Sequence, residues 1–135
     1  MAVQVKLKRI IITETSDQQF IFLQEVDGER VVPIVIGSAE ALAIDHRLKG
    51  TPFPRPMTHQ LLANVIDQLG GKLERIVIND LQKHTFFARL VIRHNGHCIE
   101  VDSRPSDAIA LGVAGNVPVY VAEHVLEEIG GENPE

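Results

Sequence analysis

An internal repeat is the feature that most constrains the fold of this 135-residue chain. The segment 38–44, SAEALAI, aligns with the segment 105–111, PSDAIAL, at a constant offset of 67 residues (from 38 to 105). Glu40 then matches Asp107, each two residues into its segment. The register runs without a gap, which favours duplication over chance recurrence of similar patterns. We therefore expect two related units that share one sheet system and one core.

The first unit is predicted to contain three strands and a helix. Alternation of apolar and polar residues indicates strands over 3–12, 19–26 and 30–36. The alternation changes phase at Arg9, and Asp27-Gly28 is typical of a two-residue hairpin turn between the second and third strands. Ser38 is then expected to cap a helix that runs to about Lys49.

A second helix is expected after a stiff loop. Three prolines fall within 51–56, and Thr58 is a suitable cap for a helix over 58–69. Five apolar residues of this helix recur at helical spacing, and we expect them to form its buried stripe. They are Leu61, Leu62, Val65, Ile66 and Leu69.

The same order of elements is predicted in the second unit. Strands are expected over 73–79, 84–94 and 97–102, a helix over 105–115, a short strand over 117–121 and a last helix over 123–129. Asn95-Gly96 is the strongest hairpin signal in the chain. A type I′ turn there would place Arg93 opposite Cys98 and Arg89 opposite Asp102.

These elements predict an α+β fold. Two β-β-β-α-type repeats, each followed by a further helix, would form a mixed or antiparallel sheet packed with helices. The length suits a single domain over 1–130, with 131–135 as a flexible tail.

Composition narrows the class of protein. With a formal net charge of -5, the chain repels nucleic acid at long range, which argues against a simple coating protein. An acidic site that binds a metal ion remains compatible with this charge. Cys98 is the single cysteine, expected to be buried, and no segment reads as a signal peptide or a membrane span. We expect a cytoplasmic protein without membrane association.

Polar residues concentrate where the last long strand meets the next helix, over 100–107. Free backbone N–H groups at a helix start suit a phosphate, and Arg104 adds a fork-shaped donor. Asp102 and Asp107 could instead hold a divalent cation. A purely structural alternative has greater weight from spacing alone: Asp102 would pair across strands, Ser103 would cap the helix, and Asp107 would favour its first turn.

Two further positions could carry chemistry. Glu40, the repeat partner of Asp107, could meet it near the axis of the repeat and share a metal ion, or could simply favour the start of its own helix. His59 follows the proline-rich loop and could act as a general base or bind phosphate, or could be a partly exposed helix-start histidine. No nucleotide-binding glycine loop or serine-hydrolase motif is present.

Beyond spacing, four runs in this order resemble the bifunctional nuclease family over roughly 5–129. They are DSRPSDAIAL at 102–111, PIVIG at 33–37 followed by Glu40-Ala41, RPxTHxLL at 55–62, and FxAxL at 86–90. The resemblance implies an α+β domain, usually oligomeric, in a family of which some members are reported to cleave RNA and DNA. Relatives commonly carry an arginine shortly after the first run, whereas this chain continues GVAG over 112–115.

On this resemblance the leading hypothesis is hydrolysis of phosphodiester bonds in RNA and DNA, with Mg²⁺ or Mn²⁺ as a possible cofactor. The catalytic candidates are Asp102, Asp107, His59 and Arg104; the substrate-binding candidates are Arg104, Ser106 and Thr58; the metal-binding candidates are Asp102, Asp107 and Glu40. The alternative is a non-enzymatic oligomeric domain that binds an anion or a protein. On either hypothesis we expect a homo-oligomer, a dimer as the first choice, because symmetric dimers are the commonest assembly.

Overall fold

Each half of the chain is an antiparallel three-stranded meander followed by a helix, as the repeat predicts. The computed structural model describes residues 1–132. Its first unit contains β1 (Ala2–Ile11), β2 (Gln18–Glu25), β3 (Val31–Gly37) and α1 (Ser38–Lys49). Its second unit contains β4 (Gly71–Gln82), β5 (Thr85–His94), β6 (His97–Ser103) and α3 (Pro105–Val113). The remaining elements are α2 (Thr58–Gln68), β7 (Val119–Ala122) and α4 (Glu123–Glu132).

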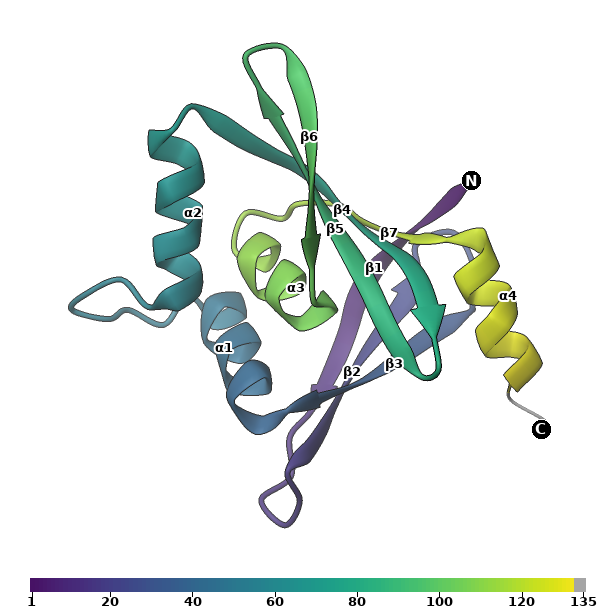
Figure 1. Cartoon of the computed structure of the whole chain (residues 1–135). Helices are drawn as coiled ribbons and strands as arrows, with labels where there is room; N and C mark the ends of the chain where they lie inside the picture. The colour runs from purple at the N-terminus through teal and green to yellow at the C-terminus, as the bar shows by residue number, and fades with distance from the viewer. Residues whose placement is uncertain (133–135) are drawn as a thin grey trace.

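All seven strands form one sheet, in the order β3-β2-β1-β7-β4-β5-β6. The two meanders lie on either side of β7, which pairs antiparallel with β1 and parallel with β4. The sheet is therefore mixed, and the predicted α+β class with two β-β-β-α units is confirmed (Figure 1).

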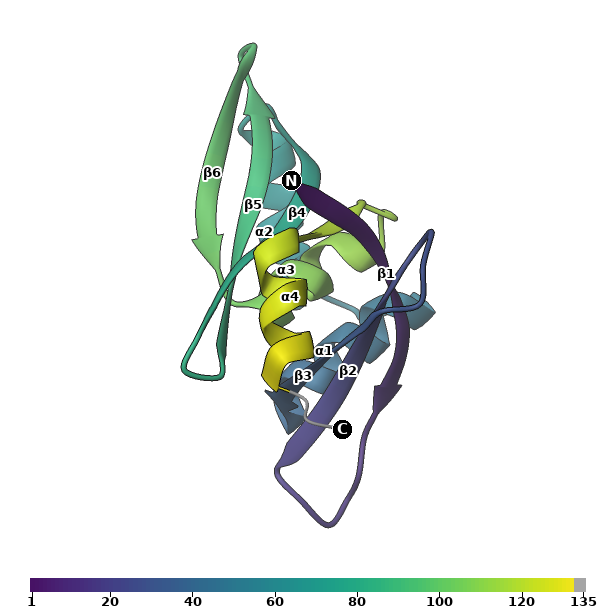
Figure 2. The same ribbon diagram turned by 90° about the vertical axis from the view of Figure 1, so that its right-hand side faces the viewer.

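The repeated helices α1 and α3 pack against each other beside the sheet. Ile44 of α1 and Ile76 and Ile78 of β4 are fully buried in a core made of aliphatic side chains. Helix α4 lies apart from the other three and packs against β4 and β7 (Figures 1 and 2). The packing of α1 on α3 brings the N-terminal turns of both repeat helices to one region. The polar residues of these two turns therefore lie close together.

Turn residues set the register of the second meander as predicted. Asn95 and Gly96 both adopt positive φ, 52° and 79°, as a type I′ turn requires. Arg93 therefore lies opposite Cys98, and Arg89 lies opposite Asp102. In the first unit a register shift between Leu7 and Arg9 is the bulge behind the change of phase near Arg9.

Two turns differ from the prediction. The amide of Glu25 donates to the carbonyl of Arg30 at 3.0 Å, so residues 26–29 form a four-residue loop rather than a tight Asp27-Gly28 turn. A tight two-residue turn that was not predicted lies at Lys83-His84, between β4 and β5, with φ of 51° and 68°. The predicted strand over 84–94 included one residue of it, because lysine is an uncommon choice for a left-handed position and no glycine or asparagine stands at this turn.

Both predicted helix caps are wrong. The N-caps of α1 and α2 are Gly37 and Met57, and neither helix start has a side-chain cap. Ser38 is already helical, and its Oγ accepts a hydrogen bond from Gln19 Nε2 at 3.1 Å. Thr58 is likewise the first residue of α2, one position too late to cap it.

The predicted burial of the α2 stripe is also wrong for four of its five residues. Of the five, Ile66 alone packs against the core. The exposed fractions of the others are 55% for Leu61, 37% for Leu62, 43% for Val65 and 71% for Leu69. Helix α2 lies at one side of the molecule and packs mainly against α3 and β4, so most of its apolar residues do not reach the core (Figure 1).

Two further expectations concern Cys98 and the C-terminus. Cys98 is exposed rather than buried, because β6 is an edge strand that is open on both faces. Helix α4 continues to Glu132, beyond the predicted end at residue 129. The predicted tail over 131–135 falls largely outside the described residues. Within residues 1–132, no helix is long and apolar enough to cross a membrane.

Candidate active site between the repeat helices

The first turns of the two repeat helices meet at one arginine. Arg104, the N-cap residue of α3, donates from Nε to Oδ2 of Asp107 at 2.9 Å. Its Nη1 donates to Oε2 of Glu40 at 3.1 Å. The two acids are the repeat partners identified in the sequence. In the fold both acids contact the same guanidinium group, which stands between them.

His59 extends this chain of polar contacts from α2. Its Nε2 lies 2.9 Å from Oδ1 of Asp107, and its side chain is only 14% exposed. Burial would raise the pKa of Asp107, but hydrogen bonds from Arg104 and His59 outweigh it and hold that pKa below its usual value. An ionised carboxylate can only accept, so His59 Nε2 is the donor in this contact.

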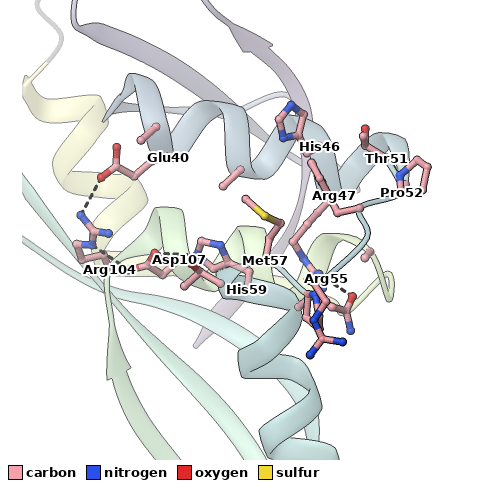
Figure 3. A pocket seen from close by; sticks show the side chains of 18 residues that line it. Glu40, His46, Arg47, Thr51, Pro52, Arg55, Met57, His59, Arg104 and Asp107 are labelled. Carbon is pink, nitrogen blue, oxygen red and sulfur yellow. Dashed lines mark hydrogen bonds and ion pairs between the residues drawn. The ribbon is translucent and has the colours of Figure 1, made fainter.

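These four side chains line a cavity of about 660 Å³ between α1, α2, α3 and the loop over 50–56. Figure 3 shows Glu40, Arg104, Asp107 and His59 in a row along one side, with Arg47 and Arg55 on another. The volume lies in the range of about 300–1,000 Å³ that is typical of small-ligand sites.

Basic side chains outnumber acidic ones in this cavity. Arg47, Arg55 and Arg104 line it together with two histidines, against Glu40 and Asp107. Among the residues that the structure describes, Arg55 has no ion-pair partner. The local charge therefore favours an anion, although the chain as a whole is acidic.

Arg47 connects the three helices around the cavity. From α1 it donates through Nε to the carbonyl of Ala110, through Nη2 to Leu111 at 3.1 Å and through Nη1 to Gln60 of α2 at 3.1 Å. Its burial lowers the pKa of its guanidinium. Its repeat partner, 67 residues later, is Ala114, which lines the same cavity. The chain thus carries in its first repeat an arginine that its second repeat lacks.

The metal candidates are only partly brought together. Both oxygens of Asp107 and Oε2 of Glu40 already accept hydrogen bonds, and Arg104 stands where a shared cation would lie. Within residues 1–132, no group of three or more His, Cys, Asp or Glu is arranged to hold a metal ion. The site as folded does not fit a divalent ion between Glu40 and Asp107 unless Arg104 moves away.

Asp102 lies away from the other candidates. It is opposite Arg89 on β5, whereas the flanking β5 residues Ala88 and Leu90 point into the core. Since side chains alternate along a strand, Asp102 points to the opposite face of the sheet and does not line the cavity. The alternative prediction of an ion pair between Asp102 and Arg89 is not met within the described residues.

The two candidates that carry a hydroxyl group, Thr58 and Ser106, line different cavities. Thr58 lines the cavity at the start of α2. Ser106 lies on the far side of Arg104 and lines a second cavity instead. The structure therefore groups Glu40, Thr58 and His59 with Arg104 and Asp107, and leaves out Asp102 and Ser106.

Arg47 and Arg55 were not among the sequence candidates. Arg55 belongs to the RPxTHxLL run, whose proline-rich approach to α2 could have indicated it. No local signal marks Arg47, because its importance comes from the packing of α1 on α3 and α2.

Comparison with known proteins gives one consistent family. The sequence profile of the bifunctional nuclease domain matches residues 21–133. An uncharacterized protein of Mycobacterium tuberculosis is 39% identical over 127 residues, which cover 94% of this chain and 76% of that protein.

Plant proteins match at lower identity. Bifunctional nuclease 2 of Oryza sativa subsp. japonica is 29% identical over 114 residues, and bifunctional nuclease 1 of Arabidopsis thaliana is 24% identical over 114 residues. Each alignment covers 82% of this chain and 35% of the plant protein, so the chain corresponds to about a third of those relatives.

Proposed function

Because this chain belongs to the bifunctional nuclease domain family, we propose that it hydrolyses phosphodiester bonds of RNA and DNA in the cavity between α1, α2 and α3. The observation that supports this most is the contact of His59 with Asp107 beside Arg104 in the cavity wall. A histidine next to a phosphate-binding group combines a candidate general base with a cation that can stabilise charge on phosphate oxygens.

His59 is the general base in this proposal. Asp107 holds the ring through Nε2, and Nδ1 takes the proton from the attacking water as the water oxygen bonds to phosphorus. The P–O bond to the leaving nucleoside oxygen breaks in the same step, and that oxygen takes up a proton from solvent. The imidazolium ion that forms is stabilised by the carboxylate beside it. General-base catalysis of this kind contributes about 10²- to 10⁴-fold to a rate.

Arg104 and Arg55 are the phosphate ligands in this proposal. Arg55 is free of ion pairs among residues 1–132, and Arg104 is 64% exposed although it contacts two carboxylates. Arg104 can therefore turn part of its fork toward a phosphate while it keeps one carboxylate. Both cations would stabilise the charge that builds on phosphate oxygens in the transition state.

A role for Mg²⁺ or Mn²⁺ stays a prediction. A metal ion would compete with Arg104 for Glu40 and Asp107, so metal-dependent activity would imply that Arg104 leaves these acids. Metal-independent activity is the outcome expected from the arrangement as folded. The cytoplasmic location also stays a prediction.

The test is a cleavage assay on single-stranded RNA and DNA with EDTA, Mg²⁺ or Mn²⁺. Wild type, His59→Ala, Asp107→Asn and Asp102→Asn would be purified identically. We expect activity in EDTA that falls about 10²-fold or more in His59→Ala and is retained in Asp102→Asn, which is the matched control outside the cavity. Equal activity in all preparations would indicate a contaminating nuclease and would contradict the proposal.

A second candidate function is a non-enzymatic domain that binds an anion or a protein partner. It is favoured by the internal pairing of the charges at the site, since Glu40 and Asp107 already neutralise Arg104. It predicts that oligonucleotides or phosphate bind to the cavity without turnover. Calorimetric binding with no product formation would favour it over hydrolysis.

A further inference from the structure

A second cavity, of about 630 Å³, adjoins the first across the Glu40–Arg104 pair. Both side chains line both cavities, so the ion pair forms part of the wall between them. A ligand group bound at Arg104 would therefore have open space on each side.

The second cavity is bounded by a free sheet edge. One wall is β3, which pairs with β2 on one side and is the terminal strand of the sheet on the other. The opposite wall is the tip of the β4–β5 hairpin with Phe86, and Pro105 and Ser106 at the start of α3 complete the lining. Apolar side chains thus lie beside the unpaired backbone groups that an edge strand offers.

One polar side chain in this cavity has no partner. Ser106 is only 5% exposed, and its hydroxyl makes no hydrogen bond to any residue that the structure describes. Asn79 Oδ1 is the one fully buried side-chain oxygen or nitrogen without a partner among the described residues, so the Ser106 hydroxyl is not sealed off from its surroundings. Its place in the cavity lining leaves it within reach of a ligand bound there.

Charge distinguishes the second cavity from the first. Asp17 and Glu40 line it, against Arg104 and one histidine. A second phosphate would meet two carboxylates there. A neutral group with flat apolar faces and polar edges fits better, and a nucleobase has both properties.

We propose that the second cavity binds the nucleoside on one side of the scissile phosphate, with Ser106 hydrogen-bonded to its base or sugar. This inference rests on the proposed function. A phosphodiester joins two nucleosides, so a site that holds its phosphate at Arg104 must accommodate a group on each side. Two adjoining hollows suit a single strand with its bases splayed apart, rather than a stacked duplex.

The test uses a single-stranded pentanucleotide with phosphorothioate linkages as an uncleavable probe, and its all-phosphate counterpart as the substrate. Ser106→Leu fills the cavity, and Ser106→Ala removes only the hydroxyl, which guards against a folding defect. Thr15→Leu, in the exposed loop between β1 and β2, is the control. A probe with one abasic position, moved along the strand, reports on base binding.

We expect Ser106→Leu to raise Kd and KM about tenfold or more, and Ser106→Ala to raise them about 2- to 10-fold, as the loss of one hydrogen bond implies. The rate at saturation stays within about twofold, the signature of a lost binding contact. An abasic residue at one position should weaken binding to wild type about as much as Ser106→Leu does.

The outcomes separate this inference from the proposed function. Cleavage by wild type with unchanged KM in both Ser106 variants overturns the inference alone. Absence of cleavage, together with weaker probe binding in the Ser106 variants, contradicts the hydrolase and supports the nucleoside site. Failure of wild type to bind the probe overturns both.

Discussion

Arg104 links the two repeats through ion pairs, because it contacts one acidic residue from each repeat. Hydrogen bonds to Asp107, and then to Glu40, raise the pKa of its guanidinium. Its side chain is nevertheless 64% exposed, and exposed ion pairs contribute only about 0–1 kcal/mol to stability. An exposed group of three converging charges that contributes so little to stability is better explained by binding or catalysis.

Replacement of Arg104 by lysine tests that explanation. Lysine keeps the charge but cannot bridge two carboxylates and a phosphate with one planar fork. We expect kcat/KM for oligonucleotide cleavage to fall about tenfold or more, the loss of one charge-assisted contact, while the free energy of unfolding changes by less than about 1 kcal/mol. A large loss of stability with unchanged kcat/KM would make Arg104 a structural residue. Arg93→Lys, at an exposed pair with Glu74, is the matched control.

Asp107 makes stability depend on pH in a defined direction. Its folded pKa is held below the ordinary value of 3.8, so its ionised form stabilises the fold above that pH. This contribution is lost as pH falls through the lowered pKa. We expect the difference in unfolding free energy between wild type and Asp107→Asn to shrink as pH falls below about pH 4. Urea denaturation at each pH measures it, and a difference that grows as pH falls from about 4 to 2 would contradict the assignment.

Between elements, the approach of α3 to the sheet depends on Gly112. A Cβ added there would lie 2.6 Å from Cδ1 of Ile76 and 3.1 Å from Cβ of Val117. Ile76 is fully buried and cannot move without disturbing the core. The glycine therefore sets the depth at which α3 lies, and with it the position of Asp107.

Gly112→Ala should lower the free energy of unfolding by about 1–3 kcal/mol, the usual result of overpacking. Gly115→Ala is the control, because a Cβ there would meet its nearest neighbour at 3.9 Å, an ordinary contact. Chemical denaturation of both variants measures the effect. Equal stability of the two would show that α3 can shift away from β4 at little cost.

The elements also show what the sequence could predict. Local signals were sufficient for both meanders and for the pairing of Arg89 with Asp102, because Asn95-Gly96 fixes a register that alternation then propagates. They failed at Ser38, where Gln19, a residue distant in sequence, supplies the hydrogen-bond partner. They also failed at Lys83-His84, where the shape of the hairpin overrides residue preference.

The repeat and the strand–helix junction selected three of the residues that line the candidate site. The offset of 67 aligned Glu40 with Asp107, the junction indicated Arg104, and in the fold Arg104 contacts both acids. Asp102 was grouped with them because it is near in sequence, but the sequence does not say which face of β6 the helices cover. The contact of His59 with Asp107 depends on how α2 returns to α3, and local pattern does not encode that path.

At the scale of the whole molecule, α2 displays an apolar stripe that the described chain leaves uncovered. Leu61, Val65 and Leu69 recur at intervals of four and are 55%, 43% and 71% exposed. Exposed apolar stripes of this kind usually mark interaction sites. We therefore propose that the expected homo-oligomer, if it forms, associates through α2, with the stripe of one copy packed on that of another.

Val65→Glu should shift the protein toward the monomer, because a buried contact would receive two unpaired charges. Asn64→Glu adds the same charge at an exposed position beside the stripe on the same helix and is the control. Sedimentation velocity at micromolar concentration, with circular dichroism to confirm folding, measures the effect. A wild-type monomer, or equal association of both variants, would contradict the placement on α2.

A double-mutant cycle tests most directly whether His59 and Asp107 act together as the general base. The quantity measured is the single-turnover cleavage rate in EDTA. If the two residues act as one base, the losses in His59→Ala and Asp107→Asn are not additive. We therefore expect the double variant to cleave no more slowly than His59→Ala alone, to within about twofold. Losses that multiply in the double variant, or single variants as fast as wild type, would contradict a His59–Asp107 active site.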